Sequence, residues 1–360
     1  MKVIRLMLSD WRNFERVEYL PQPGVNVVWG RNAQGKTNLL EAVYIAGRGV
    51  SFRQGRDRDI VKNGQPEGRL SLDFVSGGRA QNIAVTFFAD GRRKEMLLNG
   101  LAVRKASELS GVFCTVLFSP ENLSLVRDGP EERRKFLDAA ISQLRPKYQA
   151  ALADYARVLS QRNFLLKKGG GPTMPVWDER LAALGSYIVM MRGSYAAKLK
   201  KPAGTHHSDM SGGETLTVDY KWFDEDEAAL YDIKKLKELF VRRLNEASAR
   251  ELEAGVSLVG PHRDDLELMI DGAPARIFGS QGQQRSAVLA LKLAECEIAE
   301  EATGEPPVLL LDDVMSELDA ARRAYVRKNI GERQVVITTV SRTRGAVKME
   351  GGRILPCIST

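Results

Sequence analysis

One stretch, residues 30–37, constrains the chain most, because its pattern G-x-x-x-x-G-K-T is that of a phosphate-binding loop. The apolar run Val25–Trp29 before it predicts a buried strand, and the residues after it predict a helix that begins near Lys36. Glycines allow a tight turn that aims backbone N–H groups at phosphates, which then lie at the positive end of the helix. The sequence therefore predicts a nucleoside triphosphate site formed by Gly30, Arg31, Asn32, Ala33, Gln34, Gly35, Lys36 and Thr37.

The companion of such a loop is an apolar strand that ends in carboxylates, and residues 308–313 (VLLLDD) have this pattern. We expect the Lys36 ammonium to contact the β- and γ-phosphates of the nucleotide and the Thr37 hydroxyl to bind Mg²⁺. Asp312 would hold the Mg²⁺ through water, and Asp313 would orient the attacking water as the catalytic residue. The alternative, a buried strand that merely ends in a turn, is hard to reconcile with the loop upstream.

Two serine–glycine stretches compete for a second role. ATPases of the ABC type place such a motif on the γ-phosphate of a nucleotide held by a partner subunit. The stretch 210–214 precedes an alternating, strand-like pattern and supplies no helix N-terminus, whereas Ser280 opens an apolar-faced helix at 286–301. Only a helix N-terminus offers a phosphate both a positive dipole and unpaired N–H groups. We therefore predict that Ser280, Gly282 and Gln283 contact ATP across a homodimer interface and that Ser211 does not.

Composition bounds the class of protein. The 43% hydrophobic content supports a sizeable core, and no apolar run approaches the roughly 20 residues of a membrane span. The N-terminus alternates like a strand and lacks the apolar stretch of a signal peptide. Three scattered cysteines (Cys114, Cys296 and Cys357) suit a reducing cytoplasm. The net charge of +7 favours a polyanionic partner such as nucleic acid, although many proteins are mildly basic.

The pattern along the chain predicts an α/β fold in two regions. Residues 1–119 and 255–360 would form the nucleotide-binding head, with an antiparallel β sub-sheet whose hairpins turn at 90–91 and 99–100. Residues 120–254 would form a mostly helical inserted lobe with a small strand element at 215–222. Its helices, at 131–144, 146–168 and 177–201, are too short and irregular for a long coiled coil. The last core strand is expected at 334–339.

Basic side chains make the helical lobe a candidate DNA surface, although solubility explains each of them about as well. The residues we select as DNA contacts are Arg133, Arg134, Lys167, Lys168, Lys200 and Lys201. The basic loop 48–58 could meet DNA phosphates or the nucleotide, or be a solvated run of charge. His206 and His207 are interpreted as part of a polar loop and not as zinc ligands, because no cysteine or third histidine lies at ligand spacing.

The motifs, in this order, resemble the ABC-type ATPase heads of chromosome-maintenance and DNA-repair proteins, and within that group the bacterial RecF recombination mediators. The resemblance covers nearly the whole chain. It is carried by residues 47–53 (GRGVSFR), 118–122 (FSPEN), 133–138 (RRKFLD), 161–167 (QRNFLLK), 260–266 (GPHRDDL), 280–285 (SQGQQR) and 311–319 (LDDVMSELD).

The resemblance implies a cytoplasmic, nucleoid-associated protein of recombinational DNA repair, replication-gap processing and the SOS response. Such a protein would bind ATP and Mg²⁺, dimerise around ATP and bind single-stranded, gapped or junction DNA. It would help to load the RecA recombinase together with RecR and RecO. Ala33 stands where many relatives have glycine, but Lys36 and the glycines at both ends of the loop are in place. Asp313 replaces the glutamate usual in the wider ABC class, and Thr339 replaces its switch histidine, so that slow hydrolysis is expected.

Two other classes share some of these motifs. The ATP-binding subunit of an ABC transporter would have the loop, the signature and the acidic strand, but it would partner a membrane protein. The basic helical insertion and stretches such as 260–266 argue against it. A chromosome-tethering ATPase would need long coiled coils, which the sequence does not predict.

Overall fold

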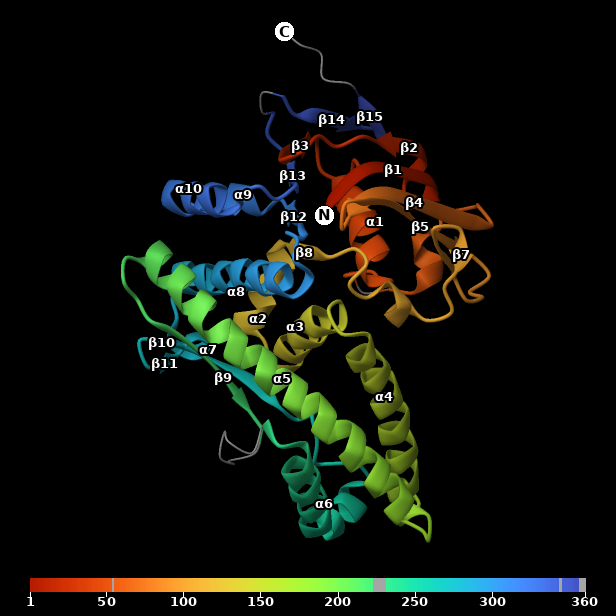
Figure 1. Ribbon diagram of the computed structural model, residues 1–360, viewed down its shortest axis with the longest axis vertical. Helices are drawn as coiled ribbons and strands as arrows, with labels where there is room; N and C mark the ends of the chain where they lie inside the picture. The colour runs from red at the N-terminus through yellow and green to blue at the C-terminus, as the bar shows by residue number, and fades with distance from the viewer. Residues whose placement is uncertain (54, 223–230, 343–344, 356–360) are drawn as a thin grey trace. The chain divides into compact units, whose positions relative to one another are not determined.

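A computed structural model describes residues 1–53, 55–222, 231–342 and 345–355 of the 360-residue chain (Figure 1). The chain forms two compact units, Met1–Asn122 with Lys292–Thr360, and Leu123–Leu291. The first predicted boundary, at 119, is close to this division, but the return to the first unit lies at 292 and not at 255. The reason is strand pairing, since residues 265–270 add a strand to the sheet of the second unit.

The first unit contains an antiparallel sheet of six strands, in the order β2-β1-β4-β5-β6-β7. Both predicted hairpins are confirmed, because β5 pairs with β6 and β6 with β7. Asn99 and Gly100 have φ of 51° and 78°, the positive values that the tight β6–β7 turn requires. The strands are β1 (Lys2–Trp11), β2 (Phe14–Tyr19), β4 (Glu67–Ser76), β5 (Arg79–Phe88), β6 (Glu95–Leu98) and β7 (Leu101–Ala102), with 3-10 turns η1 (Asp57–Ile60) and η2 (Ala106–Leu109).

A second six-stranded sheet of this unit, in the order β15-β14-β3-β13-β12-β8, is parallel except for the β14–β15 pair. Its strands are β3 (Val25–Trp29), β8 (Thr115–Phe118), β12 (Val308–Asp312), β13 (Val335–Thr339), β14 (Val347–Glu350) and β15 (Arg353–Leu355). The sheet continues past the strand expected to be its last, since β14 pairs with β3. The prediction that β3 is buried is only partly right, because Val28 is fully covered whereas Val25 is 55% exposed.

Helix α1 (Lys36–Arg48) contacts strands of both sheets of the first unit. All of its residues except Thr37 and Asn38 are buried, as expected of a helix that is apolar around most of its circumference. This packing fixes the N-terminal end of α1, and with it the glycine-rich loop, at the carboxyl ends of β3, β12 and β13. The unit also contains the helices α9 (Val314–Glu317) and α10 (Ala320–Asn329).

The second unit is mostly helical, with one three-stranded antiparallel sheet in the order β11-β10-β9. The helices predicted at 131–144, 146–168 and 177–201 are confirmed. The elements after η3 (Pro120–Leu123) are α2 (Ser124–Arg127), α3 (Pro130–Ser142), α4 (Pro146–Lys167), α5 (Met174–Ser211), β9 (Leu216–Lys221), α6 (Ile233–Ala254), β10 (Asp265–Ile270), β11 (Ala273–Pro274), α7 (Ala275–Phe278) and α8 (Gln281–Thr303), which continues into the first unit.

Helix α5 is longer than predicted, and this corrects the interpretation of His206 and His207. The helix continues through Pro202 and Gly204 to Ser211, so both histidines lie on a helix and are buried, and they do not form a polar loop. Proline and glycine weaken a helix locally, but packing of α5 against β9 offsets that cost. The His207 imidazole lies 3.4 Å from the Glu214 carboxylate. Burial lowers the pKa of His207, and the charge of Glu214 opposes that shift.

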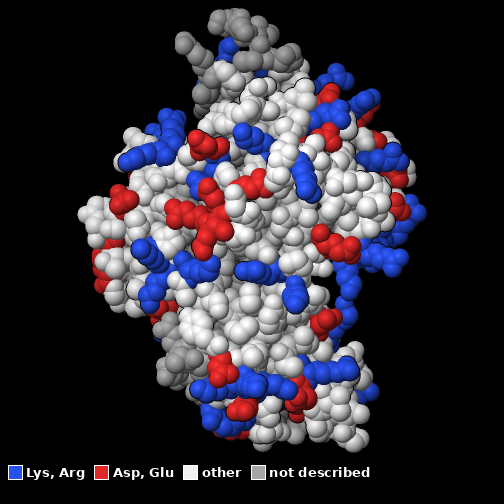
Figure 2. Space-filling model, viewed as in Figure 1, with Lys and Arg blue, Asp and Glu red and all other residues white. Residues whose placement is uncertain are grey.

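Two cysteines, Cys114 and Cys296, are buried free thiols, and Cys357 lies outside the described residues. None of the helices in the described part of the chain is long and apolar enough to cross a membrane. On the face shown in Figure 2, basic and acidic side chains are interspersed. The net charge of +7 is therefore not gathered into a single patch on that face.

Candidate functional site

The glycine-rich loop, residues 30–37, connects β3 to α1, as its sequence predicts. Gly35 precedes the helix with φ of 105°, and a Cβ atom there would lie 2.5 Å from the Phe14 ring. A Cβ atom on Gly30 would lie 2.3 Å from the carbonyl oxygen of Met349 in β14. Both glycines are therefore required by close packing inside the protein, in addition to any role in approaching phosphate.

Ala33 also has a positive φ, of 64°, which is unfavourable for a residue that carries a Cβ atom. The loop is braced by Asn13, whose amide donates to the Gln34 carbonyl oxygen at 3.2 Å and accepts from the Asn38 amide at 2.7 Å. The backbone N–H of Gly351 donates to the Gln34 side chain at 2.6 Å. The loop is thus held in shape by contacts from two other segments of the first unit.

Lys36 is buried, and its ammonium donates to the carbonyl oxygens of Gly30 at 2.6 Å and Arg31 at 2.9 Å. Burial lowers the pKa of Lys36, and the charges of Asp313 and Asp312 oppose that shift. Among the described residues, no side chain caps the N-terminus of α1, and the first turn of the helix contains no carboxylate. The helix end therefore presents a positive dipole beside a buried ammonium, which is the arrangement that binds an anion.

The structure brings Thr37 and Asp312 together, although 275 positions separate them in sequence. The Thr37 hydroxyl donates to an Asp312 oxygen at 3.1 Å, and the Thr338 hydroxyl donates to the same oxygen at 2.6 Å. Burial raises the pKa of Asp312, whereas the bonds from Thr338 and Thr37 lower it. Hydroxyl and carboxylate oxygens are the ligands that Mg²⁺ prefers, and Mg²⁺ usually takes one or two of them together with substrate phosphates. These two side chains therefore fit a magnesium site.

Asp313 follows the strand end and begins α9 with φ of 52°. Its backbone N–H donates to the Thr338 hydroxyl at 3.0 Å, and the Ser316 hydroxyl donates to the Asp313 carbonyl oxygen at 2.6 Å. Thr338 thus positions both acidic residues, and sequence reasoning missed it. The signal that would have found it is the parallel register of β12 and β13, which places Thr338 opposite Asp312.

A second buried carboxylate, Glu41 of α1, holds the basic loop that follows the helix. Arg12 donates two hydrogen bonds to Glu41, at 2.9 and 2.6 Å, and Ser51 donates one at 2.6 Å. Arg48 is buried too, in an ion pair with Glu295 at 3.1 Å and a bond to the Thr115 carbonyl oxygen. Arg48 is therefore neither a solvated charge nor open to a phosphate, and it ties α1 to its neighbours.

In the second unit, Ser280 lies directly before the first residue of α8 and is exposed. Its backbone N–H donates to the Gln283 side chain at 2.8 Å, and the Gln283 backbone N–H donates to the Ser280 hydroxyl at 3.2 Å. This reciprocal pair is a capping box, so the predicted helix start is confirmed. Ser211 lies at the opposite kind of helix end, where its hydroxyl donates to the His207 carbonyl oxygen at 2.7 Å. Carbonyl groups and the negative dipole end make that position unsuitable for phosphate.

The six residues selected as DNA contacts fall into three groups. Arg133 is buried in an ion pair with Asp265 at 2.6 Å, and Arg134 donates to the Asp264 carbonyl oxygen, so both stabilise the lobe itself. Lys200 pairs with Asp219 at 2.8 Å on the surface. The other three, Lys167, Lys168 and Lys201, are exposed.

The chain resembles known proteins along almost its whole length. The sequence pattern of the family described as RecF/RecN/SMC N terminal domain matches residues 2–350. A DNA replication and repair protein RecF from Ruminiclostridium cellulolyticum is 36% identical over 374 residues, covering 99% of this chain and all of the relative.

Two solved structures have the same fold over the same extent. One, of the recombination mediator protein RecF-ATPrS in the RecFOR pathway, has a TM-score of 0.92 and 35% sequence identity, and covers 98% of this chain and 97% of its own. The other, of RecF-ATP in the same pathway, has a TM-score of 0.89 and 36% identity, with 98% and 96% covered. The mixed α/β arrangement of this chain, with its antiparallel sheet and helical lobe, is therefore that of an ABC-type head.

Proposed function

This chain belongs to the RecF family of DNA replication and repair proteins, and we propose that it acts there as an ATP-driven dimer that binds DNA. One observation supports the ATP site above all: the Thr37 hydroxyl donates a hydrogen bond to Asp312 beside the uncapped N-terminus of α1. One site thus offers an anion-binding helix end, a buried ammonium and two hard oxygen ligands. Two solved relatives, described as RecF-ATP and RecF-ATPrS, support ATP as the nucleotide.

Within this site, residues 30–37 hold the phosphates, and Lys36 exchanges its loop carbonyl contacts for phosphate oxygens. Thr37 and Asp312 are the side chains that would hold Mg²⁺, which would neutralise negative charge on the phosphates. Asp313 orients the attacking water. Its carboxylate is one methylene shorter than a glutamate, and Thr339 cannot supply the contact of a histidine, so hydrolysis is slow.

The second half of each site comes from another copy of the chain. Ser280, Gly282 and Gln283 lie at an exposed helix N-terminus, and the capping box leaves the Ser280 hydroxyl free to donate its proton. Moving a population from mostly monomer to mostly dimer takes about 5.5 kcal/mol, or roughly 2.7 for each of two nucleotides. Charge-assisted hydrogen bonds to two γ-phosphates supply energies of this size, and ADP lacks that phosphate.

The ATP-bound dimer would bind single-stranded, gapped or junction DNA, and with RecR and RecO it would help to load RecA during recombinational repair and the SOS response. It would act in the cytoplasm, at the nucleoid. Three of the candidate DNA contacts are exposed and have no ion-pair partner in the described part of the lobe, namely Lys167, Lys168 and Lys201. Membership of the RecF family argues against the alternative of a transporter subunit.

Light scattering with ATP or ADP tests the proposal. The wild type is expected to be dimeric with ATP and largely monomeric with ADP. Lys36→Met removes the buried ammonium at the phosphate position and should abolish ATP binding, while its loss of two loop contacts leaves the fold intact.

Ser280→Arg should bind ATP almost normally yet stay monomeric, because the arginine blocks the contact across the dimer. Ser211→Arg is the matched control and should dimerise like the wild type. A dimeric Ser280→Arg variant, or a monomeric Ser211→Arg variant, would show that the signature has been assigned to the wrong serine. Normal ATP affinity in Lys36→Met would overturn the assignment of the loop.

A further inference from the structure

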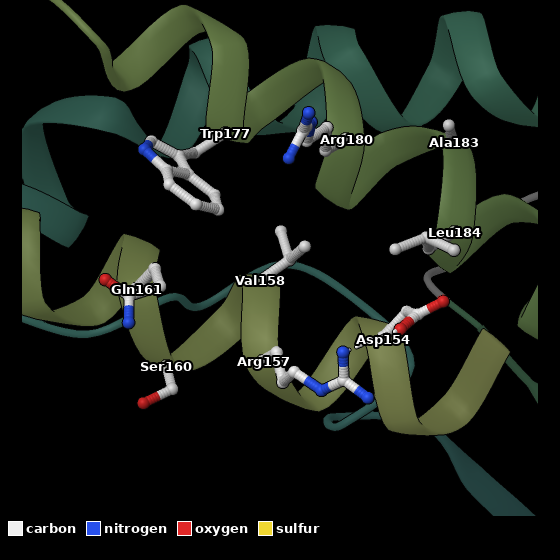
Figure 3. A pocket seen from close by; sticks show the side chains of 9 residues that line it. All are labelled: Asp154, Arg157, Val158, Ser160, Gln161, Trp177, Arg180, Ala183 and Leu184. Atoms are coloured by element: carbon white, nitrogen blue, oxygen red, sulfur yellow. Dashed lines mark ion pairs between the residues drawn. The ribbon is translucent and has the colours of Figure 1, made fainter. Parts of the chain in front are cut away.

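A groove in the second unit runs between helices α4 and α5, with a cavity volume of about 730 Å³. This volume is within the range of sites that bind small organic groups. In Figure 3, Val158 from α4 and Trp177 from α5 project into the same space from opposite sides. We call it the α4–α5 groove, and the side chains that matter for its chemistry are Asp154, Arg157, Val158, Gln161, Trp177 and Arg180.

The α4 side of the groove continues as a stripe toward the end of the helix. Arg157, Gln161 and Phe164 are spaced by four and three residues, so they lie on one face of α4, and Lys168 follows at the same spacing. Phe164 is 53% exposed, and the Lys168 ammonium lies 4.3 Å from the centre of its ring. The stripe thus places one exposed aromatic ring between two cationic side chains, Arg157 and Lys168.

Contacts inside the protein account for the residues on the buried face of α4, but they do not account for those on the exposed face that carries Gln161 and Phe164. Arg162 is buried and donates to Glu251 at 2.6 Å and to Ser257 at 2.8 Å, and the Asn163 side chain accepts from Ser257. These bonds account for the buried part of the stretch 161–167. Gln161 and Phe164, from the same stretch, point away from that network toward the solvent. One exposed aromatic residue is ordinary on a protein surface, but Phe164 lies on the same face of α4 as Arg157 and Gln161, which line the groove.

The charges around the α4–α5 groove favour an anionic occupant. Nearby carboxylates are occupied, since Asp178 pairs with Arg162 at 2.6 Å and Glu179 pairs with Lys237. Arg180 lies over the Trp177 ring at 5.8 Å from its centre. Within the described residues, neither Arg180 nor Lys168 has a carboxylate partner. Arg157 has one, Asp154 at 3.3 Å, and that pair is exposed to solvent.

We propose that the α4–α5 groove is a base-stacking site for single-stranded DNA. Trp177 and Phe164 stack on unpaired bases, and Arg157, Arg180 and Lys168 contact the phosphates between them. Aromatic platforms beside cations bind single strands with little sequence preference, because every base has a π face and every nucleotide a phosphate. A duplex cannot use the groove in this way, since its bases are already stacked on each other. The inference rests on the proposed DNA-binding function and gives it a location.

Two measurements locate the contact. A thymidine oligonucleotide that carries 5-iodouracil is irradiated in the presence of the full-length protein and ATP, and the cross-linked peptide is identified by mass spectrometry. Cross-links at Trp177 or Phe164 are expected. In fluorescence anisotropy, Trp177→Ala and Phe164→Ala are each expected to weaken binding of a plain thymidine oligonucleotide by about tenfold. Trp177→Phe should restore most of the affinity, because it keeps an aromatic face.

Matched variants and probes distinguish base stacking from electrostatic attraction between the protein and any polyanion. Arg180→Ala should weaken single-strand binding several-fold, whereas Arg79→Ala, which removes the same charge from β5 in the first unit, should not. Duplex affinity should change little in Trp177→Ala. Poly-glutamate of the same length should compete poorly with the oligonucleotide, because it has charge but no bases.

Each contrary result overturns the inference in a recognisable way. Unchanged single-strand affinity in Trp177→Ala shows that the groove does not bind the strand, and equal losses for duplex and single strand show that bases are not stacked there. Efficient competition by poly-glutamate shows a site for acidic peptide. If the wild-type dimer binds no DNA at all, the proposed function itself is wrong. That result comes from the wild type alone and is therefore distinct from any result with the groove variants.

Discussion

At the scale of single residues, the glycine-rich loop 30–37 is strained at Ala33, because alanine there adopts a backbone conformation that favours glycine. Ala33 has φ of 64°, a conformation that costs an L-residue about 1–2 kcal/mol relative to the right-handed region. The loop nevertheless holds this conformation, because Asn13 and Gly351 bond to the neighbouring Gln34. Contacts from the rest of the first unit thus offset the local strain.

Ala33→Gly should raise the free energy of unfolding by up to about 1 kcal/mol, because relief of the strain exceeds the entropy that glycine adds to the unfolded chain. Urea unfolding measures the change. The control is Ala153→Gly on the exposed face of α4, which should lower the free energy of unfolding by about 1 kcal/mol. Equal losses in both variants would show that Ala33 is not strained.

At the scale of elements, buried ionic groups join the helices of the lobe to the strand β10 and the turn before it. Arg192 of α5 donates two bonds to Asp138 of α3, each of 2.9 Å, and one to the Pro261 carbonyl oxygen at 2.6 Å. Asp264 is buried and accepts a hydrogen bond from the Tyr220 hydroxyl of β9, with Arg192 3.7 Å away. The stretch 260–266 therefore has a structural role, as the point where four elements of the second unit are tied together.

Burial raises the pKa of Asp264 to about 7, and Arg192, Tyr220 and Arg134 only partly oppose the shift. A folded-state pKa above the ordinary value of 3.8 means that folding favours the protonated acid. The stability that Asp264 contributes is therefore present below about pH 4 and is lost as the pH rises through about 7. Asp264→Asn cannot ionise, so the wild type should lose stability relative to this variant between about pH 4 and pH 7.

Urea unfolding of the wild type and Asp264→Asn at several pH values across that window measures this difference. Asp90→Asn, at an exposed turn of the first unit, is the control for loss of a carboxylate. A difference in stability that does not change with pH, or that favours the wild type as the pH rises, would contradict the prediction.

At the scale of the whole molecule, the net charge of +7 is dispersed on the face seen in Figure 2, and several arginines are committed to internal pairs. Arg48, Arg133, Arg162 and Arg192 are buried in this way. Fewer cations are therefore available to DNA than the composition suggests. The proposed binding to DNA would depend on the lysines and arginines that are exposed.

DNA affinity of the ATP-bound protein should fall log-linearly with salt, because each neutralised phosphate releases counterions. With about three or four phosphate contacts, the loss from about 50 to 200 mM salt should be roughly ten- to a hundredfold. Unrelated sequences of the same length should bind alike. Anisotropy titrations over a series of salt concentrations measure the slope, and an affinity indifferent to salt would refute a phosphate-based contact.

Local features of the site were predictable from the sequence, because neighbours in the chain determine them. The loop before α1, the hairpin turn at Asn99 and Gly100, and the helix start at Ser280 each depend on a few consecutive residues with specific backbone or capping chemistry. The order of the motifs was also sufficient to identify the family.

The tertiary structure alone decided which distant groups meet and which charges are buried. Strand register places Thr338 against Asp312, packing carries α5 through Pro202 to bury His206 and His207, and β10 joins the sheet of the second unit. The same applies to Arg133, which the sequence analysis selects as a DNA contact and which is held by Asp265. The physical reason is that pairing, desolvation and register depend on distances between segments far apart in the chain, and local patterns carry no information about those distances.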